Sequence, residues 1–438
     1  MISASKKILG NPLICSDEVT KYAVEKNLIW IYILLLLFEG ALRKWFLPFL
    51  STPLLIVRDP IVMILVYLGI KKNLINNLYV YLSIILTVFE VFLSLFLPHT
   101  NIIVCYFGAR ITLFYFPVIF MIGKVLDKKD AFVIGRLFLY LSIPMTFLVM
   151  IQFFSPQTAF VNQGVGGDAE GGGFGGVLDY YRASAIFSFT QGYICFQNVV
   201  YAFILIFYSY EDKRKTYGIS KRVLLIVFVL YLISIPMSIS RTLLVSTIVQ
   251  SLFWLFSIAK INGGTRKLCL ILILLALIIP ILMSIEYVQL FIDVLLARFE
   301  SASDAEGDFV EGSIIDRYGG AFLRAFQIEN LPPGGYGIGA GTRVGLKLVN
   351  PNLFTDEEWS RIMLESGIYI GTIFVMIRLM LTYILATKSL NKYVNGNVLP
   401  SFFLPLTMMF LPFGPFGSTV YLGFAVLIVG LNMCVLNK

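Results

Sequence analysis

The sequence is poor in charged residues. Only 14% of its 438 residues are Asp, Glu, Lys or Arg, whereas 58% are hydrophobic, and the mean hydropathy is +0.85. A water-soluble protein of this length needs many more charges on its exterior, so the composition excludes that class. The apolar residues also occur in runs of roughly 18–25, the length that crosses about 30 Å of hydrocarbon. The sequence therefore predicts an integral membrane protein.

Residues that build metal sites and disulfide frameworks are scarce as well. His99 is the one histidine, and the acidic residues at 304–311 lack the spacing of a calcium loop. The five cysteines are scattered and form no CxxC pair: Cys15, Cys105, Cys195, Cys269 and Cys434. Neither a zinc site nor a disulfide framework is expected from this pattern. We expect no metal and no cofactor.

Nucleotide-binding motifs and a signal peptide are also missing. No GK[ST] sequence is present, which excludes a P-loop, and no βαβ pattern surrounds the glycines of GYGIGAG at 335–341. We expect these glycines to form tight turns that also let a substrate approach the backbone. Residues 1–26 lack the regions of a signal peptide, so the apolar run from Leu28 is expected to remain as an anchor.

Twelve apolar segments are long enough to be transmembrane helices. They are expected near residues 28–47, 53–70, 74–97, 102–123, 131–154, 184–209, 221–239, 241–259, 267–285, 361–387, 397–412 and 416–436. The predicted fold is an all-α integral membrane protein of about 12 transmembrane helices, with residues 1–438 in a single polytopic domain. Two long loops remain on one side, a Gly-rich loop at 155–183 and a loop at 286–360 with many acidic residues. Loops of this length are usually functional.

Lysine predicts the orientation in the membrane. If the N-terminus is cytoplasmic, basic groups at 71–72, 124–129, 213–222, 260–267 and 388–392 fall in five successive cytoplasmic loops. This arrangement obeys the positive-inside rule each time, and the opposite one would violate it five times. The net charge of +8 is thus explained by membrane orientation, without nucleic acid as a partner. Both termini are expected in the cytoplasm and both long loops in the periplasm.

Arginine has the opposite distribution. On this topology 17 of 19 lysines lie on or next to the cytoplasmic side, but 10 of 15 arginines lie in the outer half: Arg43, Arg58, Arg110, Arg182, Arg241, Arg298, Arg317, Arg324, Arg343 and Arg361. An arginine within hydrocarbon costs about 2.5–3.5 kcal/mol and needs a compensating partner. Guanidinium keeps its charge and binds phosphate or carboxylate through paired hydrogen bonds. An outer cavity rich in arginine therefore predicts a phosphate-bearing ligand.

Some of these arginines have a structural explanation instead. Arg43 and Arg58 are expected to snorkel or to pair locally, and Arg58 is followed by Asp59. Arg324 stands among acidic residues and is expected to be solvated. Arg378, deep in the tenth span, is expected to pair inside the bundle, while Arg110 is open to a structural or a ligand-binding role.

Several segments in the second half of the chain share one resemblance. RASAIF begins at Arg182, SISR ends at Arg241, and Arg317 is followed by LPPGGYGIGAG at 331–341 and by EEWSRIMLESG at 357–367. These segments resemble the O-antigen polymerase and O-antigen ligase superfamily of bacterial membrane glycosyltransferases. The resemblance lies in the residues of the segments, in their order and in the side of the membrane that is predicted for them. The resemblance covers roughly residues 180–375.

This resemblance implies a fold, a location and a reaction. The fold would be a GT-C-like glycosyltransferase with a long periplasmic loop, in a bacterial inner membrane. Because nucleotide sugars are absent outside the membrane, the donor would be an undecaprenyl-diphosphate-linked oligosaccharide. A sugar hydroxyl would attack its anomeric carbon, and the lipid diphosphate would leave. The product would be a surface polysaccharide of the O-antigen type, and the implied partners are membrane lipid and a chain-length regulator.

The reaction requires two kinds of side chain. Preorganised arginines stabilise the charge that develops on the diphosphate without a metal, and a carboxylate accepts the proton of the incoming hydroxyl. The candidate diphosphate ligands are Arg182, Arg241, Arg317, Arg110 and Arg343. The candidate catalytic bases are Glu357 and Glu358, with Asp316 and Glu365 as alternatives. Glu357 and Glu358 also have a structural explanation, because acidic residues are favourable at the start of a helix.

A missing histidine decides between the branches of the family. Ligases of this group place a histidine where this chain has Asp356 or Glu357, and His99 belongs to another outward loop. The polymerase branch is therefore favoured, with an O-antigen ligase that transfers glycan to lipid A-core as the alternative. A lipid-linked oligosaccharide flippase is a further alternative, but it would be expected to have short outward loops.

Overall fold

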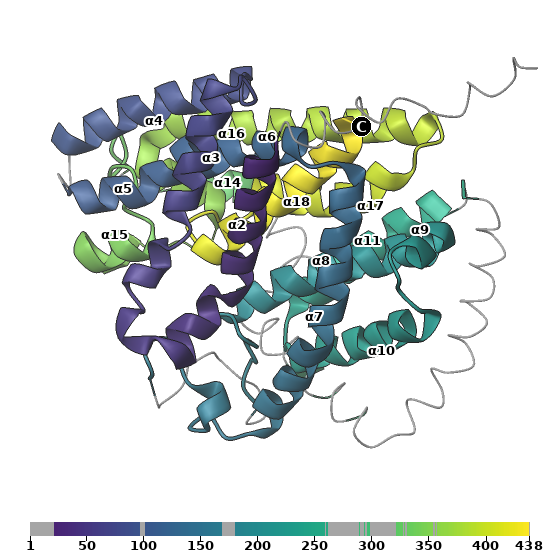
Figure 1. Ribbon diagram of the computed structural model, residues 1–438. Helices are drawn as coiled ribbons and strands as arrows, with labels where there is room; N and C mark the ends of the chain where they lie inside the picture. Colours follow the sequence, from purple (N-terminus) through teal and green to yellow (C-terminus); the bar gives the residue numbers. More distant parts are fainter. Residues whose placement is uncertain are drawn as a thin grey trace, which may run out of the picture.

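The computed structural model describes residues 22–96, 101–168, 180–258, 260–261, 321–326, 331–353 and 357–437, with single positions at 289, 293, 296–297, 328 and 355. Within this part of the chain the regular secondary structure is helical throughout (Figure 1). The expected all-α class is therefore confirmed.

Eight helical segments among these residues are long and apolar enough to cross a membrane. Six of them are α4 (Leu78–Phe96), α7 (Lys128–Phe154), α8 (Thr190–Ser209), α11 (Arg241–Ile258), α16 (Glu358–Val394) and α18 (Thr419–Asn437). The seventh segment is Pro53–Lys71, which contains η3 (Pro53–Ile56) and α3 (Asp59–Lys71). The eighth is Ile102–Val125, which consists of α5 (Ile102–Arg110), the π-helix η4 (Ile111–Tyr115) and α6 (Phe116–Val125).

Three further predicted spans correspond to helices that are shorter or more charged. The first is α2 (Ala23–Ala41), which contains Glu25, Lys26 and Glu39. The others are α10 (Lys221–Met237), of 17 residues, and α17 (Leu399–Phe413), of 15 residues. The predicted span at 267–285 lies outside the described residues. The eight segments establish the membrane character, and the total of twelve stays a prediction.

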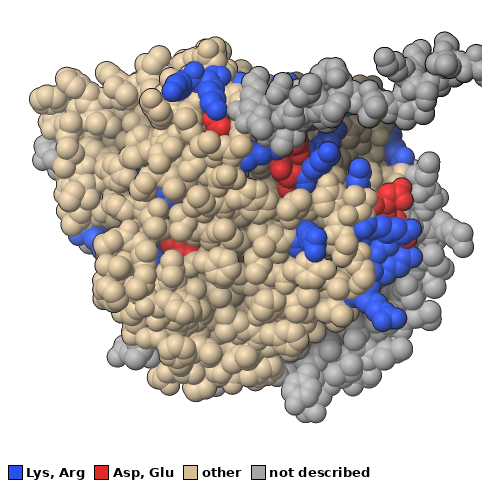
Figure 2. Space-filling model, viewed as in Figure 1, with Lys and Arg blue, Asp and Glu red and all other residues tan. Residues whose placement is uncertain are grey.

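The outer surface of the molecule is largely apolar. Large hydrophobic side chains are exposed on the spans, among them Phe92, Phe256 and Tyr383. Figure 2 shows a broad face almost without charged residues, with Lys and Arg gathered at its edge over α9 (Glu211–Thr216). Exposed apolar area of this extent fits a lipid environment, because a soluble monomer exposes much smaller patches.

The central helix of the bundle is α18. Nearly all of its residues are buried, and it packs against α6, α17 and α8. Glycines bring α18 and α6 close together, since a Cβ on Gly430 would lie 2.6 Å from Cβ of Ile122 and one on Gly123 would lie 2.6 Å from Cβ of Met433. Small residues at helix crossings allow this close backbone approach in membrane proteins.

Polar contacts join the junctions that the sequence predicts to be cytoplasmic. At the start of α2, Lys26 pairs with Asp130 of α7 at 2.6 Å. After α3, Lys72 pairs with Glu25 at 2.5 Å. The ring of Tyr217, which follows α9, stacks on a phenylalanine of α7. These junctions therefore lie together at one end of the bundle, as a common membrane side requires.

The start of α8 differs from the sequence expectation. The helix begins at Thr190 and not near residue 184. The reason is Ala185, which has a φ of 49° and is held by the side chain of Gln152. Oε1 of Gln152 accepts the Ala185 N–H at 2.8 Å, and Nε2 donates to the Ala185 carbonyl at 3.1 Å. The segment before α8 therefore stays non-helical and carries Arg182.

Candidate functional site

A sharp bend divides α16 into two helical segments. Gly367 has φ 73° and ψ 170°, a backbone conformation that glycine alone adopts readily. Because of this bend, Nη1 of Arg378 lies 2.7 Å from Oε1 of Glu358, although 20 residues separate them in sequence. A straight helix would place them about 30 Å apart. The segment expected as one span at 361–387 is thus a helical hairpin.

The glycine-rich segment 331–341 packs into this bend. The N–H of Tyr336 donates to the Leu364 carbonyl at 2.8 Å. Gly335 has a φ of 70°, and a Cβ on it would overlap the Glu365 carbonyl oxygen. The tight turns expected here are therefore present. The close approach that these glycines permit is to the backbone of α16.

An open cavity of about 500 Å³ lies beside the first half of α16. Its walls also come from the segment before α8, from α15 (Arg343–Leu348) and from the α17–α18 connection. The charged residues in these walls are Arg182, Arg343, Arg361, Glu357 and Glu358. Aromatic side chains complete them: Trp359, Phe410, Phe413 and Tyr421. A large cavity in which convergent charged groups stand among aromatic side chains has the form of a ligand site.

Glu357 is the N-cap residue of α16, at the edge of the cavity. Its side chain is 19% exposed, and Nε of Arg324 donates to its Oε1 at 2.8 Å. The second nitrogen of Arg324, Nη2, contacts the same oxygen. Arg324 is exposed, as expected, and it also forms an ion pair with Glu357 that the sequence did not indicate. The other oxygen, Oε2, receives a long contact of 3.4 Å from the hydroxyl of Ser360.

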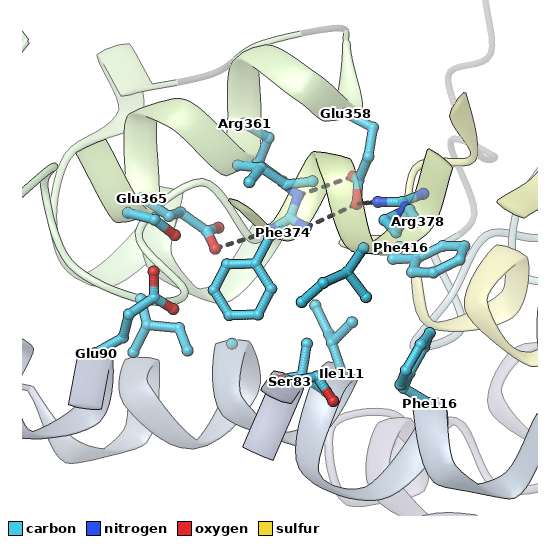
Figure 3. Close-up of a pocket in the computed structure, with 16 residues that line it drawn as sticks. Ser83, Glu90, Ile111, Phe116, Glu358, Arg361, Glu365, Phe374, Arg378 and Phe416 are labelled. Atoms are coloured by element: carbon cyan, nitrogen blue, oxygen red, sulfur yellow. Dashed lines mark hydrogen bonds and ion pairs between the residues drawn. The ribbon is translucent and has the colours of Figure 1, made fainter. Parts of the chain in front are cut away.

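Glu358 has a very different environment from its neighbour. Its side chain is buried, and both oxygens accept hydrogen bonds from Arg361, at 2.9 Å and 2.8 Å. Arg378 binds it from the other half of α16, and Arg361 also pairs with Glu365 at 2.7 Å. Figure 3 shows these four side chains as one continuous network between the two segments of the hairpin. The expectation that Arg378 pairs inside the bundle is confirmed.

Arg182 and Arg343 face the cavity from two different elements. Arg182 lies in the segment before α8, and Arg343 is the first residue of α15. The guanidinium of Arg343 stacks on the ring of Phe189 at 3.6 Å and makes no ion pair with a described residue. Partial desolvation and the like charge of Arg43 lower the pKa of Arg343. The cavity thus contains positive charge for which an anion would be a favourable partner.

Two other predicted diphosphate ligands lie outside the walls of this cavity. Arg110 is 2% exposed, and its Nη1 pairs with Asp59 at 2.7 Å. Arg58, which is not among the candidate ligands, pairs with Glu39 at 2.9 Å, and the acid that it contacts is thus not the adjacent Asp59. Arg241 begins α11 and does not line the cavity, although the next residue does.

Three of the predicted site residues, Arg317, Asp316 and Asp356, lie outside the described residues. The candidate base Glu365 is described, and its carboxylate is held by Arg361 and by the N–H of Gly341 at 3.1 Å. The structure therefore brings together Arg182, Arg343, Glu357 and Glu358 from the predicted set.

A second, small cavity of about 60 Å³ adjoins the network and shares Glu358 and Arg361 with the first. Glu90 of α4 points into it toward Glu365 (Figure 3). Glu90 is buried, and its Oε1 has no hydrogen-bond partner among the described residues. Sequence reasoning missed both Glu90 and the network. The spacing Glu358-x-x-Arg361-x-x-x-Glu365 was the available signal, because it places three charges on one helix face.

Comparisons with known proteins give no relative: no family model, curated protein or solved structure matches the chain. The described residues contain no group of three or more His, Cys, Asp or Glu side chains that could hold a metal ion.

Proposed function

We propose that this protein is a surface-polysaccharide polymerase of the O-antigen type. It transfers undecaprenyl-diphosphate-linked glycan onto a lipid-linked oligosaccharide acceptor at the periplasmic face of a bacterial inner membrane. The observation that carries the proposal is the open cavity in which Arg182 and Arg343 stand with Glu357. Twelve spans, cytoplasmic termini and a GT-C-like architecture belong to the same proposal.

The two arginines suit the diphosphate of the donor. They come from separate elements, so they can contact different phosphates of one group. Negative charge grows on the leaving diphosphate during transfer, and fixed guanidinium groups stabilise it without moving. Arg361 is already neutralised by Glu358 and Glu365, so its role is to hold the wall of the site. The proposed mechanism therefore needs no metal.

Glu357 is the better candidate for the base than Glu358. Both oxygens of Glu358 accept hydrogen bonds from Arg361, and the side chain is buried. Glu357 lies at the cavity edge, and among the described residues its Oε2 makes only the long contact with Ser360. Arg324 orients the carboxylate by donating to its other oxygen, Oε1. Glu357 can then accept the proton of a sugar hydroxyl as the anomeric bond breaks.

The test uses purified protein and undecaprenyl-diphosphate oligosaccharide as the only substrate. We expect a ladder of products spaced by one repeat unit, formed equally well in EDTA. The Glu357→Gln variant should bind the substrate but give no ladder. Products that form only after lipid A-core is added would indicate a ligase, and no new glycosidic bond in either case would overturn the transferase proposal. Loss of the ladder in EDTA with rescue by magnesium would overturn the metal-free mechanism.

A further inference from the structure

The buried face of α4 is polar, although its exposed side chains are hydrophobic. The buried residues that follow Val80 on this helix are Ser83, Thr87, Glu90 and Ser94. The hydroxyl of Thr87 lies 2.6 Å from that of Thr112, and Oγ of Ser94 accepts the Ile338 N–H at 2.8 Å. An ionisable residue inside a membrane span is costly and usually functional, so Glu90 is a candidate for a role of its own.

Glu90 has no positively charged partner among the described residues. Its side chain is 4% exposed, and Oε1 is buried without a hydrogen bond. The same cavity is lined by two arginines, which are bound elsewhere. Arg361 holds Glu358 and Glu365. Arg378 holds Glu358 and two main-chain carbonyl groups. Neither guanidinium is therefore left to pair with Glu90.

The charges in the described walls of this cavity do not balance if every carboxyl group is ionised. Three glutamates line it, Glu90, Glu358 and Glu365, but only two arginines do. One negative charge is thus in excess, in a membrane interior where an unpaired carboxylate is very costly. The excess is removed when one of the three carboxyl groups holds a proton.

Glu90 is the carboxyl group best placed to hold that proton. Glu358 and Glu365 each form ion pairs with arginine, whereas Glu90 forms none with a described residue. Glu90 points toward Glu365 across the cavity (Figure 3). The carboxylate of Glu365 pairs with Arg361 and accepts the Gly341 N–H, and its remaining lone pairs can accept one more hydrogen bond. A protonated Glu90 supplies the donor.

We propose that Glu90 and Glu365 form a proton-binding site, in which the carboxyl group of Glu90 holds the proton and donates a hydrogen bond to the carboxylate of Glu365. The proton removes the excess charge and allows the two acidic groups to face each other. The bond also fixes Glu365, which holds Arg361 in the wall of the main cavity. Glu90 is thus a positioning residue, and this role does not depend on the proposed glycan reaction.

The other elements that pack closely against α4 are α5 and η4. Three of their titratable side chains bind the carboxylate of Asp59: Tyr106, Arg110 and Tyr115. Cys105 of α5 lies in a small apolar cluster with Ile338. The charged groups that face Glu90 are therefore the four of the α16 network.

Infrared spectroscopy tests the site directly, because a protonated carboxyl group absorbs apart from an ionised one. Full-length protein is measured at neutral pH in a detergent without ester groups, since ester carbonyls would overlap the signal. We expect a protonated-carboxyl band that shifts when glutamate is labelled with ¹³C and that is missing in Glu90→Gln. The control is Glu211→Gln, which removes an exposed, lysine-paired carboxylate and should leave this band unchanged. Spectra in which Glu90→Gln removes no such band would overturn the proposal.

Thermal unfolding in detergent gives an independent test. Glu90→Gln keeps an uncharged donor to Glu365 and should unfold close to the wild type, whereas Glu90→Leu has no donor and should unfold at a lower temperature. A Gln variant as unstable as the Leu variant would contradict the hydrogen bond.

The pH dependence of unfolding reports the proton itself. The folded wild type holds a proton that the carboxyl group releases once unfolding exposes it to water, so the unfolding midpoint should fall as the pH rises. The fall should be smaller in Glu90→Gln, which has no proton to release at this position. Equal falls in the two proteins would speak against a bound proton.

A bound sodium ion is the alternative source of positive charge. The cavity, of about 60 Å³, has room for such an ion and a few water molecules. Replacing sodium with choline in all buffers should leave the wild-type midpoint unchanged. A midpoint that sodium raises in the wild type but not in Glu90→Gln would show a cation in place of the proton and overturn the proposal.

Discussion

Two adjacent glutamates in this protein have opposite surroundings. Glu357 lies at the edge of an open cavity, whereas Glu358 is buried between two arginines from the two halves of a helical hairpin. Consecutive residues therefore differ: the carboxylate of Glu357 is open to the cavity, whereas that of Glu358 is fixed in an ion-pair network. Substitutions at the two positions should have different effects.

Glu358→Gln should destabilise the protein. Removing one member of a buried ion pair leaves the other charge unpaired, which costs about 3–5 kcal/mol. The loss is measured as a lower midpoint of thermal unfolding in detergent. Replacing both partners, with Glu358→Leu and Arg378→Met, should lower the midpoint less than Glu358→Gln does. A midpoint unchanged by Glu358→Gln would contradict the structural role.

Arg182→Lys and Arg343→Lys should each reduce polymer formation by roughly 10- to 100-fold. Lysine keeps the charge but loses the planar pair of donors that matches a phosphate. The rate of ladder formation measures the effect at equal expression, with Lys347→Arg as an exposed control. Near-normal ladders from both lysine variants would leave these arginines with a structural role only.

At the scale of elements, the bend in α16 depends on Gly367. A Cβ there would overlap the Pro333 carbonyl, and the φ of 73° is unfavourable for alanine. Gly367→Ala should therefore cost roughly 2–5 kcal/mol from backbone strain and overlap together. The control is Gly218→Ala, which has a similar φ of 68° but open space around its Cβ. Equal unfolding midpoints for the two variants would contradict a specific packing role of the bend.

The helices were predictable from the sequence, but the hairpin was not. Apolar runs of span length locate the long helices to within a few residues, because the bilayer imposes both length and hydropathy. The bend at Gly367 cannot be recognised from the hydropathy of the sequence. It is determined by the docking of 331–341 on the α16 backbone, a contact between segments that are separated in the chain.

The candidate site was predictable in part for the same reason. The resemblance indicated Arg182, Glu357 and Glu358, which the structure brings to one cavity. It did not indicate which of the two carboxylates is held in ion pairs, because that depends on Arg378 from the other half of the hairpin. Likewise, Arg58 pairs with Glu39 of a different helix and not with the adjacent Asp59, since packing decides the nearest acid.

At the scale of the whole molecule, the orientation in the membrane can be tested directly. Reporters fused at residues 126, 214 and 391 should be cytoplasmic, and reporters at 168 and 330 should be periplasmic. The reason is that the lysine-rich junctions obey one charge rule and lie together at one end of the bundle. The activity of fused alkaline phosphatase reports a periplasmic position, and the fluorescence of fused green fluorescent protein reports a cytoplasmic one. A cytoplasmic reporter at 330 would overturn both the orientation and the proposed reaction.

The network in α16 also bears on how the chain enters the membrane during synthesis. Glu358 and Glu365 carry two negative charges, and Arg361 and Arg378 carry two positive ones, so the hairpin has no net charge from these four. Three of them, Glu358, Arg361 and Glu365, lie within eight residues and pair as soon as that segment is helical. Four separate charges would each cost about 2.5–3.5 kcal/mol to insert. Because these charges pair within the hairpin, we expect it to enter lipid as a neutral unit before α17 and α18, which follow it in the chain, have been made.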